Sequence, residues 1–164
     1  TWGNSEYGGD SGKVSSQLPG GIIEIFSTFG AFAALKKDGS VITWGYSRYG
    51  GDSGKVSSKL QGGVTEIFST LGAFAALKKD GSVVTWGNSE RGGDSGKVSS
   101  QLQGGVTEIF STYWAFAALK EDGSVVTWGV SNAGGDSRKV SKQLRGGVIT
   151  LASPFLKREV SRAK

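Results

Sequence analysis

The side chains in this sequence that could do chemistry are mainly carboxylates, and they occur one per loop. Two series recur at a spacing of 42 residues, namely Asp10, Asp52, Asp94 and Asp136, and the turn residues Asp38, Asp80 and Asp122. A cation would need several of these oxygens at one site, whereas an Asx hydrogen bond needs only the backbone of the aspartate's own turn. Glycosidase-type catalysis needs two acids in different environments, and near-identical copies give their acids nearly the same environment. We therefore expect aspartates that cap turns, no catalytic residue and no metal site.

The composition excludes whole classes of mechanism. The chain has 164 residues with no His and no Cys, so His-dependent nucleophilic catalysis, thiolate chemistry, structural zinc, disulfides and iron–sulfur clusters are excluded. Residues 92–98, Gly-Gly-Asp-Ser-Gly-Lys-Val, are superficially similar to a phosphate-binding loop. That motif requires Gly where Arg91 stands and Ser or Thr where Val98 stands. We expect a Gly-rich loop here and no cofactor.

An internal repeat organises the chain. The pair Trp-Gly recurs at Trp2, Trp44, Trp86 and Trp128. Residues 2–43 and 44–85 are identical at 34 of 42 positions, and residues 44–85 and 86–127 at 35 of 42. The sequence therefore predicts a repeat domain over residues 1–153, built from repeats 2–43, 44–85 and 86–127 and a partial repeat 128–153, followed by a basic C-terminal tail over residues 154–164.

Each repeat carries the signals of a strand followed by a hairpin. Strands are expected at 22–28, 64–70 and 106–112, where Val64, Glu66 and Phe68 alternate with Thr65, Ile67 and Ser69. The Asp-Gly pairs that follow, at 38–39, 80–81 and 122–123, predict type I′ hairpins. A strand is also expected over residues 148–153. The segment 92–105 and its equivalents favour a short helical turn, with an outer edge strand as the alternative.

These elements predict an all-β protein. Strand, hairpin and loop at a period near 42 residues are typical of one blade of a β-propeller. We expect a β-propeller-type repeat array of about four blades, either closed, open or incomplete, with a β-trefoil as the alternative. The tryptophan of each Trp-Gly pair is expected in the core, the alternative being an exposed ring for sugar stacking. The chain opens at Thr1-Trp2-Gly3 without Met, so we expect a part of a longer protein.

Residues 76–87, Ala-Leu-Lys-Lys-Asp-Gly-Ser-Val-Val-Thr-Trp-Gly, resemble the regulator of chromosome condensation repeat. The pattern recurs at 34–45 and 118–129 and in part at 1–3, and the resemblance covers most of residues 1–153. It implies a propeller of seven four-stranded blades that serves as a docking surface, and the family's best-known member is a guanine-nucleotide exchange factor that binds chromatin. The family's frequent His before Ala-Leu is Phe or Ala here, and the repeat is short. The resemblance therefore implies the fold more than the chemistry.

The residues that differ between repeats gather before the hairpin and after Trp-Gly. They are rich in Tyr, Trp and Arg, the residue types that anchor protein interfaces. We expect both groups to lie on loops at the blade ends, where they form a contact surface for a protein partner, neutral drift being the alternative. The candidate partner-binding residues are Tyr7, Tyr46, Arg48, Tyr49, Arg91, Tyr113 and Trp114.

The charge is uneven along the chain. The net charge of +5 arises from residues 138–164, which hold eight Lys or Arg and one Glu, whereas residues 1–137 hold 11 Lys or Arg and 13 Asp or Glu. This tail only weakly suggests nucleic acid, and a solvated terminus is the simpler interpretation. No apolar run is long enough to cross a membrane.

Taken together, the sequence predicts a non-catalytic protein-binding propeller module that presents variable loops on a repeated scaffold. The alternatives are an exchange or regulatory factor for a small GTPase, and a structural array in a larger protein. Open sheet edges would also permit self-association.

Overall fold

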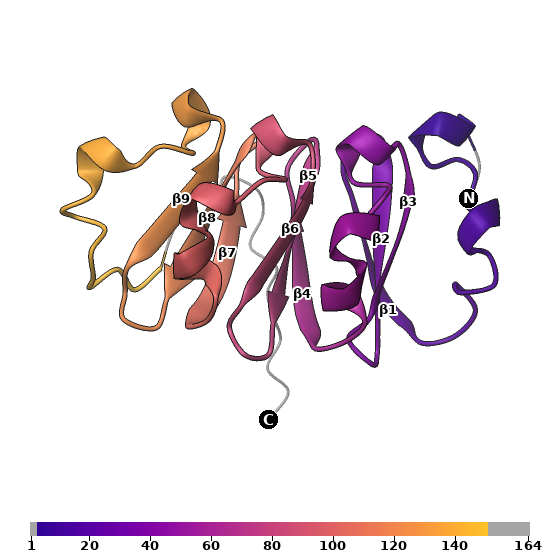
Figure 1. Cartoon of the computed structure of the whole chain (residues 1–164), viewed down its shortest axis with the longest axis horizontal. Coiled ribbons are helices and arrows are strands. Elements are labelled where there is room, and N and C mark those ends of the chain that lie inside the picture. The colour runs from indigo at the N-terminus through magenta and orange to yellow at the C-terminus, as the bar shows by residue number, and fades with distance from the viewer. Residues whose placement is uncertain (1–2, 151–164) are drawn as a thin grey trace.

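The computed structural model describes residues 3–150 and confirms an all-β, propeller-type array. Three antiparallel three-stranded sheets follow one another along the chain and stand side by side in a row (Figure 1). Sheet 1 contains β1 (Ile22–Ser27), β2 (Ala31–Lys36) and β3 (Val41–Gly45); sheet 2 contains β4 (Val64–Ser69), β5 (Ala73–Lys78) and β6 (Val83–Gly87); sheet 3 contains β7 (Val106–Ser111), β8 (Ala115–Lys120) and β9 (Val125–Gly129). The arrangement is a row of separate sheets and not a β-trefoil.

Short 3₁₀ helices lie before, between and after the sheets. They are η1 (Ser5–Tyr7), η2 (Gly12–Val14), η3 (Ser47–Tyr49), η4 (Gly54–Leu60), η5 (Ser89–Arg91), η6 (Gly96–Leu102), η7 (Ser131–Ala133) and η8 (Arg138–Val140). We call residues 3–21, 46–63, 88–105 and 130–147 linking segments 1 to 4. The expected helical turn is therefore present as 3₁₀ helix, and the edge-strand alternative is wrong.

The two ends of the row differ in what they carry. At the end that is uppermost in Figure 1 lie η1, η3, η5 and η7 together with the turns after β1, β4 and β7. We call this the loop end. The Asp-Gly hairpins lie at the opposite, hairpin end. Each sheet therefore has two variable segments at the same end: the turn after its first strand and the start of the linking segment after its third strand, which begins about 16 residues later in the sequence.

The hairpins form where the sequence predicts them, but their turn type differs from the prediction. In the first hairpin the Gly39 amide donates to the carbonyl of Lys36, and the Lys36 amide donates to the carbonyl of Ser40. Lys37 and Asp38 are thus the central residues of the turn, and Gly39 follows with a φ of 78°. This is the arrangement of a turn followed by a bulge with a left-handed glycine, and not a two-residue type I′ turn.

A β-bulge at the start of each first strand corrects the predicted alternation of side chains. In β4 the pairing with β5 shifts between Val64 and Glu66. The extra residue, Thr65, moves Val64 to the same face as Ile67, and both are buried in one cluster. Glu66 and Phe68 remain together on the other face. Strict period-two alternation fails because a bulge places two residues opposite one.

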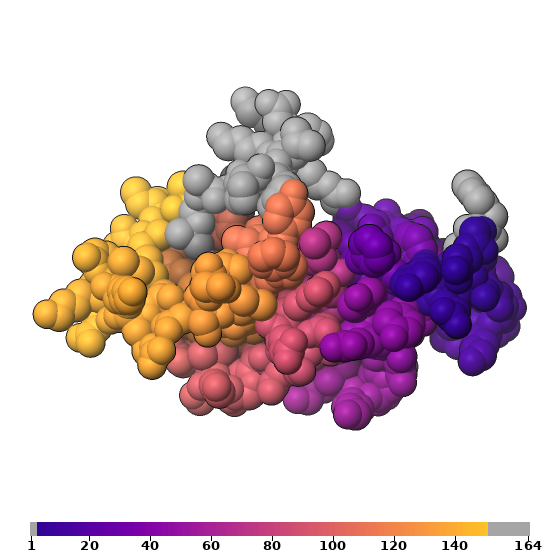
Figure 2. Space-filling model, turned by 90° about the horizontal axis from the view of Figure 1, so that it is seen from above, coloured from indigo at the N-terminus to yellow at the C-terminus, as the bar shows by residue number. Residues whose placement is uncertain are grey.

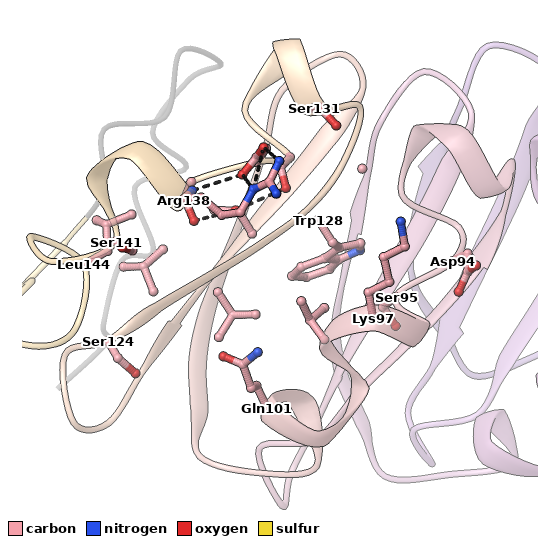
Figure 3. Close-up of a pocket in the computed structure, with 18 of the residues that line it drawn as sticks. Asp94, Ser95, Lys97, Gln101, Ser124, Trp128, Ser131, Arg138, Ser141 and Leu144 are labelled. Atoms are coloured by element: carbon pink, nitrogen blue, oxygen red, sulfur yellow. Dashed lines mark hydrogen bonds and ion pairs between the residues drawn. The ribbon is translucent and has the colours of Figure 1, made fainter.

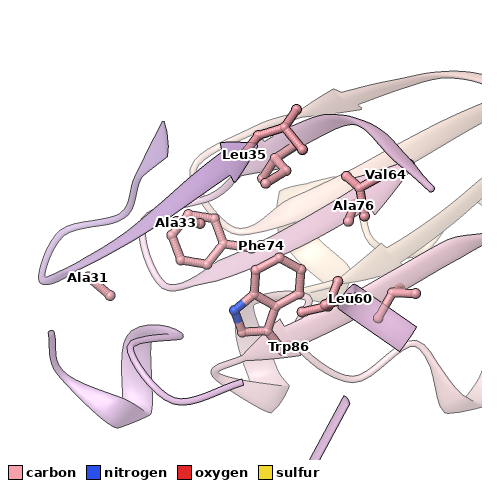
Figure 4. Close-up of a cluster of buried hydrophobic side chains, with 10 residues drawn as sticks. Ala31, Ala33, Leu35, Leu60, Val64, Phe74, Ala76 and Trp86 are labelled. Carbon is pink, nitrogen blue, oxygen red and sulfur yellow. The ribbon is translucent and has the colours of Figure 1, made fainter. Parts of the chain in front are cut away.

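The sheets pack face to face, and each has two different faces. We call the face toward the preceding repeat the front and the other the back. Between sheets 1 and 2, the back residues Ala31, Ala33 and Leu35 meet the front residues Ile67 and Phe74 (Figure 4). The same packing recurs between sheets 2 and 3. Small alanines on the back admit the large residues of the next front, so each junction buries a continuous core.

The repeated tryptophan is a core residue, as predicted. Trp44, Trp86 and Trp128 are each about 95% buried and stack on the phenylalanine of the neighbouring strand, with ring centroids 5.2–5.3 Å apart. The Nε1 of Trp86 donates to the carbonyl of Gly50 at 3.1 Å, which satisfies the only polar atom of the buried side chain. An exposed tryptophan ring for sugar stacking is therefore wrong for these three residues; Trp2 lies outside the described residues.

Up to residue 150, where the described structure ends, the fourth repeat supplies a linking segment but no sheet of its own. Its η7 and η8 form, and the Val148 amide donates to the carbonyl of Gly123 as in the earlier repeats. Residues 148–150 are not a strand, so the first half of the strand expected over 148–153 is absent. Residues 151–153 and the basic tail, 154–164, lie outside the described residues.

Candidate protein-binding surface

Hydrogen bonds hold the variable turns of the loop end in register. The Phe29 amide donates to the carbonyl of Leu71 at 3.0 Å, and the Leu71 amide donates to the carbonyl of Tyr113 at 2.9 Å. These bonds cross from one repeat to the next, so the three turns form a continuous line along the row. The side chains that vary between repeats are therefore fixed relative to one another.

A threonine in each turn ties it to the 3₁₀ helix beside it. The hydroxyl groups of Thr28, Thr70 and Thr112 donate to the carbonyls of residues 49, 91 and 133, each at 3.0 Å. The same oxygens accept backbone amides within their own turns, for example that of Ala31 at 3.1 Å. Because these threonines are the same in all repeats, the support of the surface is constant while the residues it presents change.

Four aromatic rings and one guanidinium form a continuous group at the loop end, which we call the aromatic patch: Tyr7, Phe29, Tyr46, Tyr49 and Arg91. Tyr46 and Tyr49 lie edge to face with ring centroids 5.2 Å apart, and Tyr7 is 5.9 Å from Tyr46. Phe29 contacts both Tyr7 and Tyr49 at 6.1 Å. Arg91 places its guanidinium carbon 5.7 Å from the centroid of Tyr49, a cation–π geometry.

The patch is open to solvent. Phe29 is 69% exposed, Tyr7 45% and Tyr46 37%, while Tyr49 and Arg91 are half-buried. Figure 2 looks onto the loop end and shows how the repeats follow one another beneath it. Several large rings that are partly exposed and in contact with each other make a preorganised surface, because little side-chain entropy remains to be lost on binding.

The other predicted contact residues have different surroundings. Arg48 is exposed on η3, beside the patch. Tyr113 and Trp114 are exposed on the turn of sheet 3, with their rings 6.4 Å apart, and form a second and smaller group. Phe29 is not among the contact residues predicted from the sequence, although it is the most exposed ring of the patch. The variation at its position, which holds Leu71 and Tyr113 in the next repeats, is the signal that could have identified it.

The variable positions compensate for each other in volume. A Cβ at Gly30 would lie 2.6 Å from Tyr7 and 3.2 Å from Tyr49, and a Cβ at Gly72 would lie 2.9 Å from Arg91. Glycine therefore stands where the neighbouring residue is large. The turn of the third repeat instead holds Trp114, and the residue equivalent to Tyr49 that follows its sheet is the small Ala133. Matched changes of this kind favour a packed surface over independent drift.

A groove of about 900 Å³ runs along β9 between linking segments 3 and 4 (Figure 3). Trp128 lies on its floor, and Lys97 and Gln101 line one side. On the other side Arg138 forms an ion pair with Asp136 at 2.6 Å. The hydrogen bond from Arg138 lowers the pKa of Asp136 to about 2. The charges of Arg138 and Asp136 are therefore satisfied by each other.

The repeated aspartates cap their own turns, as the sequence predicts. Asp10, Asp52 and Asp94 each accept the backbone amide two residues on, at 2.7–2.8 Å. Asp38 and its equivalents accept both the amide and the hydroxyl of the following serine, which lowers the pKa of these carboxyls. Within residues 3–150 no group of three or more acidic side chains is placed to hold a metal ion.

One acidic side chain is perturbed in the opposite direction. Burial raises the pKa of Glu66, and the nearby charge of Glu108 raises it further. These residues occupy the same position of β4 and β7 in consecutive repeats. Their proximity is a consequence of stacking identical repeats, since any charge on the strand recurs beside itself in the next sheet.

In the described part of the chain, no helix has the length and apolar character that a membrane span requires. No protein-family model matches the chain, and no curated protein sequence does either.

Solved structures with partial similarity include Prp20p from Saccharomyces cerevisiae, with 20% identity over 67% of this chain and 31% of that chain and a TM-score of 0.49. Another is human WBSCR16, with 22% identity over 73% of this chain and 37% of that chain and a TM-score of 0.46. A structure of yeast RCC1 (Prp20) bound to Kap60 has 17% identity over 66% of this chain and 29% of that chain and a TM-score of 0.43. The chain spans about a third of the length of these proteins.

Proposed function

We propose that the chain is a non-catalytic protein-binding module whose loop end is the contact surface. The observation that carries this proposal is the contiguity of Tyr7, Phe29, Tyr46, Tyr49 and Arg91, which the sequence separates by up to 84 residues and the fold brings into one patch. Tyr and Arg in a packed cluster are the residue types that dominate interface energies. The constant scaffold beneath them supplies rigidity without fixing which residues are presented.

Among the described residues, the carboxyl groups with lowered pKa values serve local structure, which supports binding over catalysis. The shifted carboxyl groups Asp38, Asp80, Asp122 and Asp136 are each paired with their own turn or with Arg138. General acid–base catalysis relies on groups whose pKa values are set near the working pH. These groups are shifted away from neutrality, and each performs a local structural role.

A direct test uses loop residues that the chain itself already tolerates. In the fourth repeat, Val130 and Ala133 stand at the positions of Tyr46 and Tyr49. The double variant Tyr46→Val/Tyr49→Ala therefore keeps side chains compatible with the backbone of the loop end. A matched control is Lys79→Glu at the hairpin end, because the third repeat has Glu121 there.

Peptides selected from a displayed random library on the full chain supply the binding probe, and fluorescence polarisation measures their Kd. We expect the double variant to weaken binding by about tenfold or more, since it removes two anchor rings, and the control to leave the Kd unchanged. Both variants should keep the far-UV circular dichroism of the parent chain. Equal binding by the double variant, or selection of no binding peptide, would overturn the proposal.

A nucleotide-release assay separates binding from exchange activity. We expect no acceleration of fluorescent GDP release from small GTPases over a range of chain concentrations. Acceleration that the Tyr46→Val/Tyr49→Ala variant abolishes would assign the surface to an exchange factor instead.

A further inference from the structure

The front face of sheet 1 is buried at Ala34, Ile42 and Trp44, but its apolar part at Ile25 and Phe32 is more exposed than in the equivalent sheets. Ile25 is 53% exposed, whereas its counterparts Ile67 and Ile109 are each 2% exposed. Phe32 is half-buried, whereas its counterpart Phe74 is completely buried. The difference arises because sheets 2 and 3 each have a preceding sheet and sheet 1 has none in the structure. An exposed surface of this kind is a site of association.

The internal junctions show what fits this face. At the junction of sheets 1 and 2, the back residues Ala33 and Leu35 cover Ile67 and Phe74. The strand that supplies these residues has the same six-residue sequence, Ala-Phe-Ala-Ala-Leu-Lys, in β2, β5 and β8. The chain therefore carries, on the back of sheet 3, another copy of the surface that its own front faces accept.

On the back of sheet 3, Ala115 and Leu119 remain buried, but Ala117 has lost some of the burial that an internal junction provides. Ala117 is half-buried, while Ala33 and Ala75 are completely buried. We propose that a second copy of this chain docks head to tail, with the front of its sheet 1 on the back of sheet 3. Ile25 and Phe32 of one copy then take the places that Ile67 and Phe74 take inside the chain.

Two linking segments meet at such a junction, whereas an internal junction contains one. Linking segment 1 is anchored on sheet 1, because the Nε1 of Trp44 donates to the carbonyl of Gly8 and because Val14 and Leu18 pack on the same cluster. Linking segment 4 has no tryptophan bond of this kind, and Gly134, the counterpart of Gly8, is exposed. It is held instead on the edge of sheet 3, where the Val125 amide donates to the carbonyl of Leu144 at 2.9 Å. Docking of a second copy therefore requires linking segment 4 to move outward with loss of this bond, which the earlier repeats do not form.

The geometry of the interface limits the size of the assembly. Front and back are different surfaces, so the contact is heterologous and generates a ring if it closes and a filament if it does not. Two copies contribute six sheets, which lies within the four to eight blades of known propellers. Three copies would contribute nine, which lies outside that range. We therefore expect a closed ring of two chains.

Light scattering coupled to size exclusion measures the mass of the full chain. We expect twice the monomer mass of 17.0 kDa for the parent and 17.0 kDa for Ile25→Asp at the same concentration. The matched control is Ile23→Thr, because Thr65 and Thr107 hold this position at the internal junctions. This control removes an exposed isoleucine of the same strand and should leave the dimer intact.

A mixing experiment identifies the two surfaces. Ile25→Asp leaves Ala117 unaltered and so keeps an intact back, whereas Ala117→Arg keeps an intact front. Each variant alone should be monomeric, and an equimolar mixture should restore a two-chain species through one intact junction. Circular dichroism checks that both variants fold, and Tyr46→Val/Tyr49→Ala, at the loop end, should still dimerise.

Four outcomes would overturn the proposal. A parent chain that stays monomeric excludes association, and a ladder of larger sizes excludes a closed ring. Dimers of Ala117→Arg that Ile25→Asp abolishes would indicate front-to-front pairing. A mixture that remains monomeric would show that the two faces do not meet. The binding proposal for the aromatic patch is unaffected by any of these results, because it is tested by a different readout.

Discussion

Equivalent phenylalanines in consecutive repeats should differ in their contribution to stability. Phe74 is completely buried between sheets 1 and 2 and stacks on Trp86, with ring centroids 5.2 Å apart. Phe32 stacks on Trp44 at 5.3 Å but is half-buried, because no sheet covers it in the structure. The pair has the same residue type, strand position and aromatic neighbour, so the comparison isolates the contribution of the sheet junction.

The magnitudes follow from burial. Replacing a buried Phe by Ala costs about 3–5 kcal/mol, so Phe74→Ala should lower the free energy of unfolding by about 4 kcal/mol. Phe32→Ala removes a ring with solvent on one side and should cost about 2 kcal/mol. A small domain has about 5–15 kcal/mol in total, so the first variant comes close to unfolding. Phe74→Leu and Phe32→Leu form a milder second pair, and we again expect the larger destabilisation at position 74.

Urea unfolding followed by tryptophan fluorescence and by circular dichroism measures both free energies. The chain is kept at a concentration where it is monomeric, because docking of a second copy would cover Phe32 and increase the destabilisation caused by Phe32→Ala. Coincident transitions and an unchanged m-value establish that the comparison is two-state. Equal costs for Phe74→Ala and Phe32→Ala in monomeric chains would refute the account of face-to-face packing.

Three further predictions test the turns and the titrating groups. Gly50→Ala should destabilise the chain by about 1–3 kcal/mol more than Gly134→Ala, because both have φ near +100° but only the Cβ at Gly50 would lie 2.6 Å from a buried ring; thermal unfolding of the two variants measures the difference. The pKa of Glu66 is raised by burial, so its ionisation reduces stability as the pH rises, and Glu66→Gln should be more stable than the parent at pH 7 but not below about pH 4. A melting temperature of Glu66→Gln below that of the parent at pH 7 would contradict this. Carboxyl NMR titration should give Asp136 a pKa of about 2, which Arg138→Gln returns toward about 3.9; no change in the variant would rule out the ion pair as the cause.

The repeat made much of the fold predictable. Because three copies agree at most positions, the first strands, the hairpins and the burial of tryptophan could be inferred from one repeat and applied to the others. The capping role of the aspartates was predictable because the interaction is local: an Asx bond depends only on residues two positions apart. The sequence also indicated which residues vary; these include all five members of the aromatic patch, four of which were among the predicted contact residues.

Some features could not be predicted from local patterns. The bulge at Thr65 changes which face Val64 occupies, and nothing in the alternation of residues signals it. The hairpin turn is displaced by one residue because the strands pair through Lys36 and Ser40, so Asp38 precedes the left-handed position instead of occupying it. Both depend on the pairing between strands, which local sequence constrains only weakly.

The sequence by itself determined the period, the all-β elements, the core tryptophans and the absence of His- and Cys-dependent chemistry. Tertiary structure alone decided that the two variable segments of each repeat meet at one end of the row, that Arg91 reaches Tyr49 across a repeat boundary, and that Ile25 is exposed where Ile67 is buried. The physical reason is that residue type and spacing set local conformation, whereas exposure depends on whether a neighbouring sheet is present. Identical residues at equivalent strand positions therefore have different roles at the end of a row and within it.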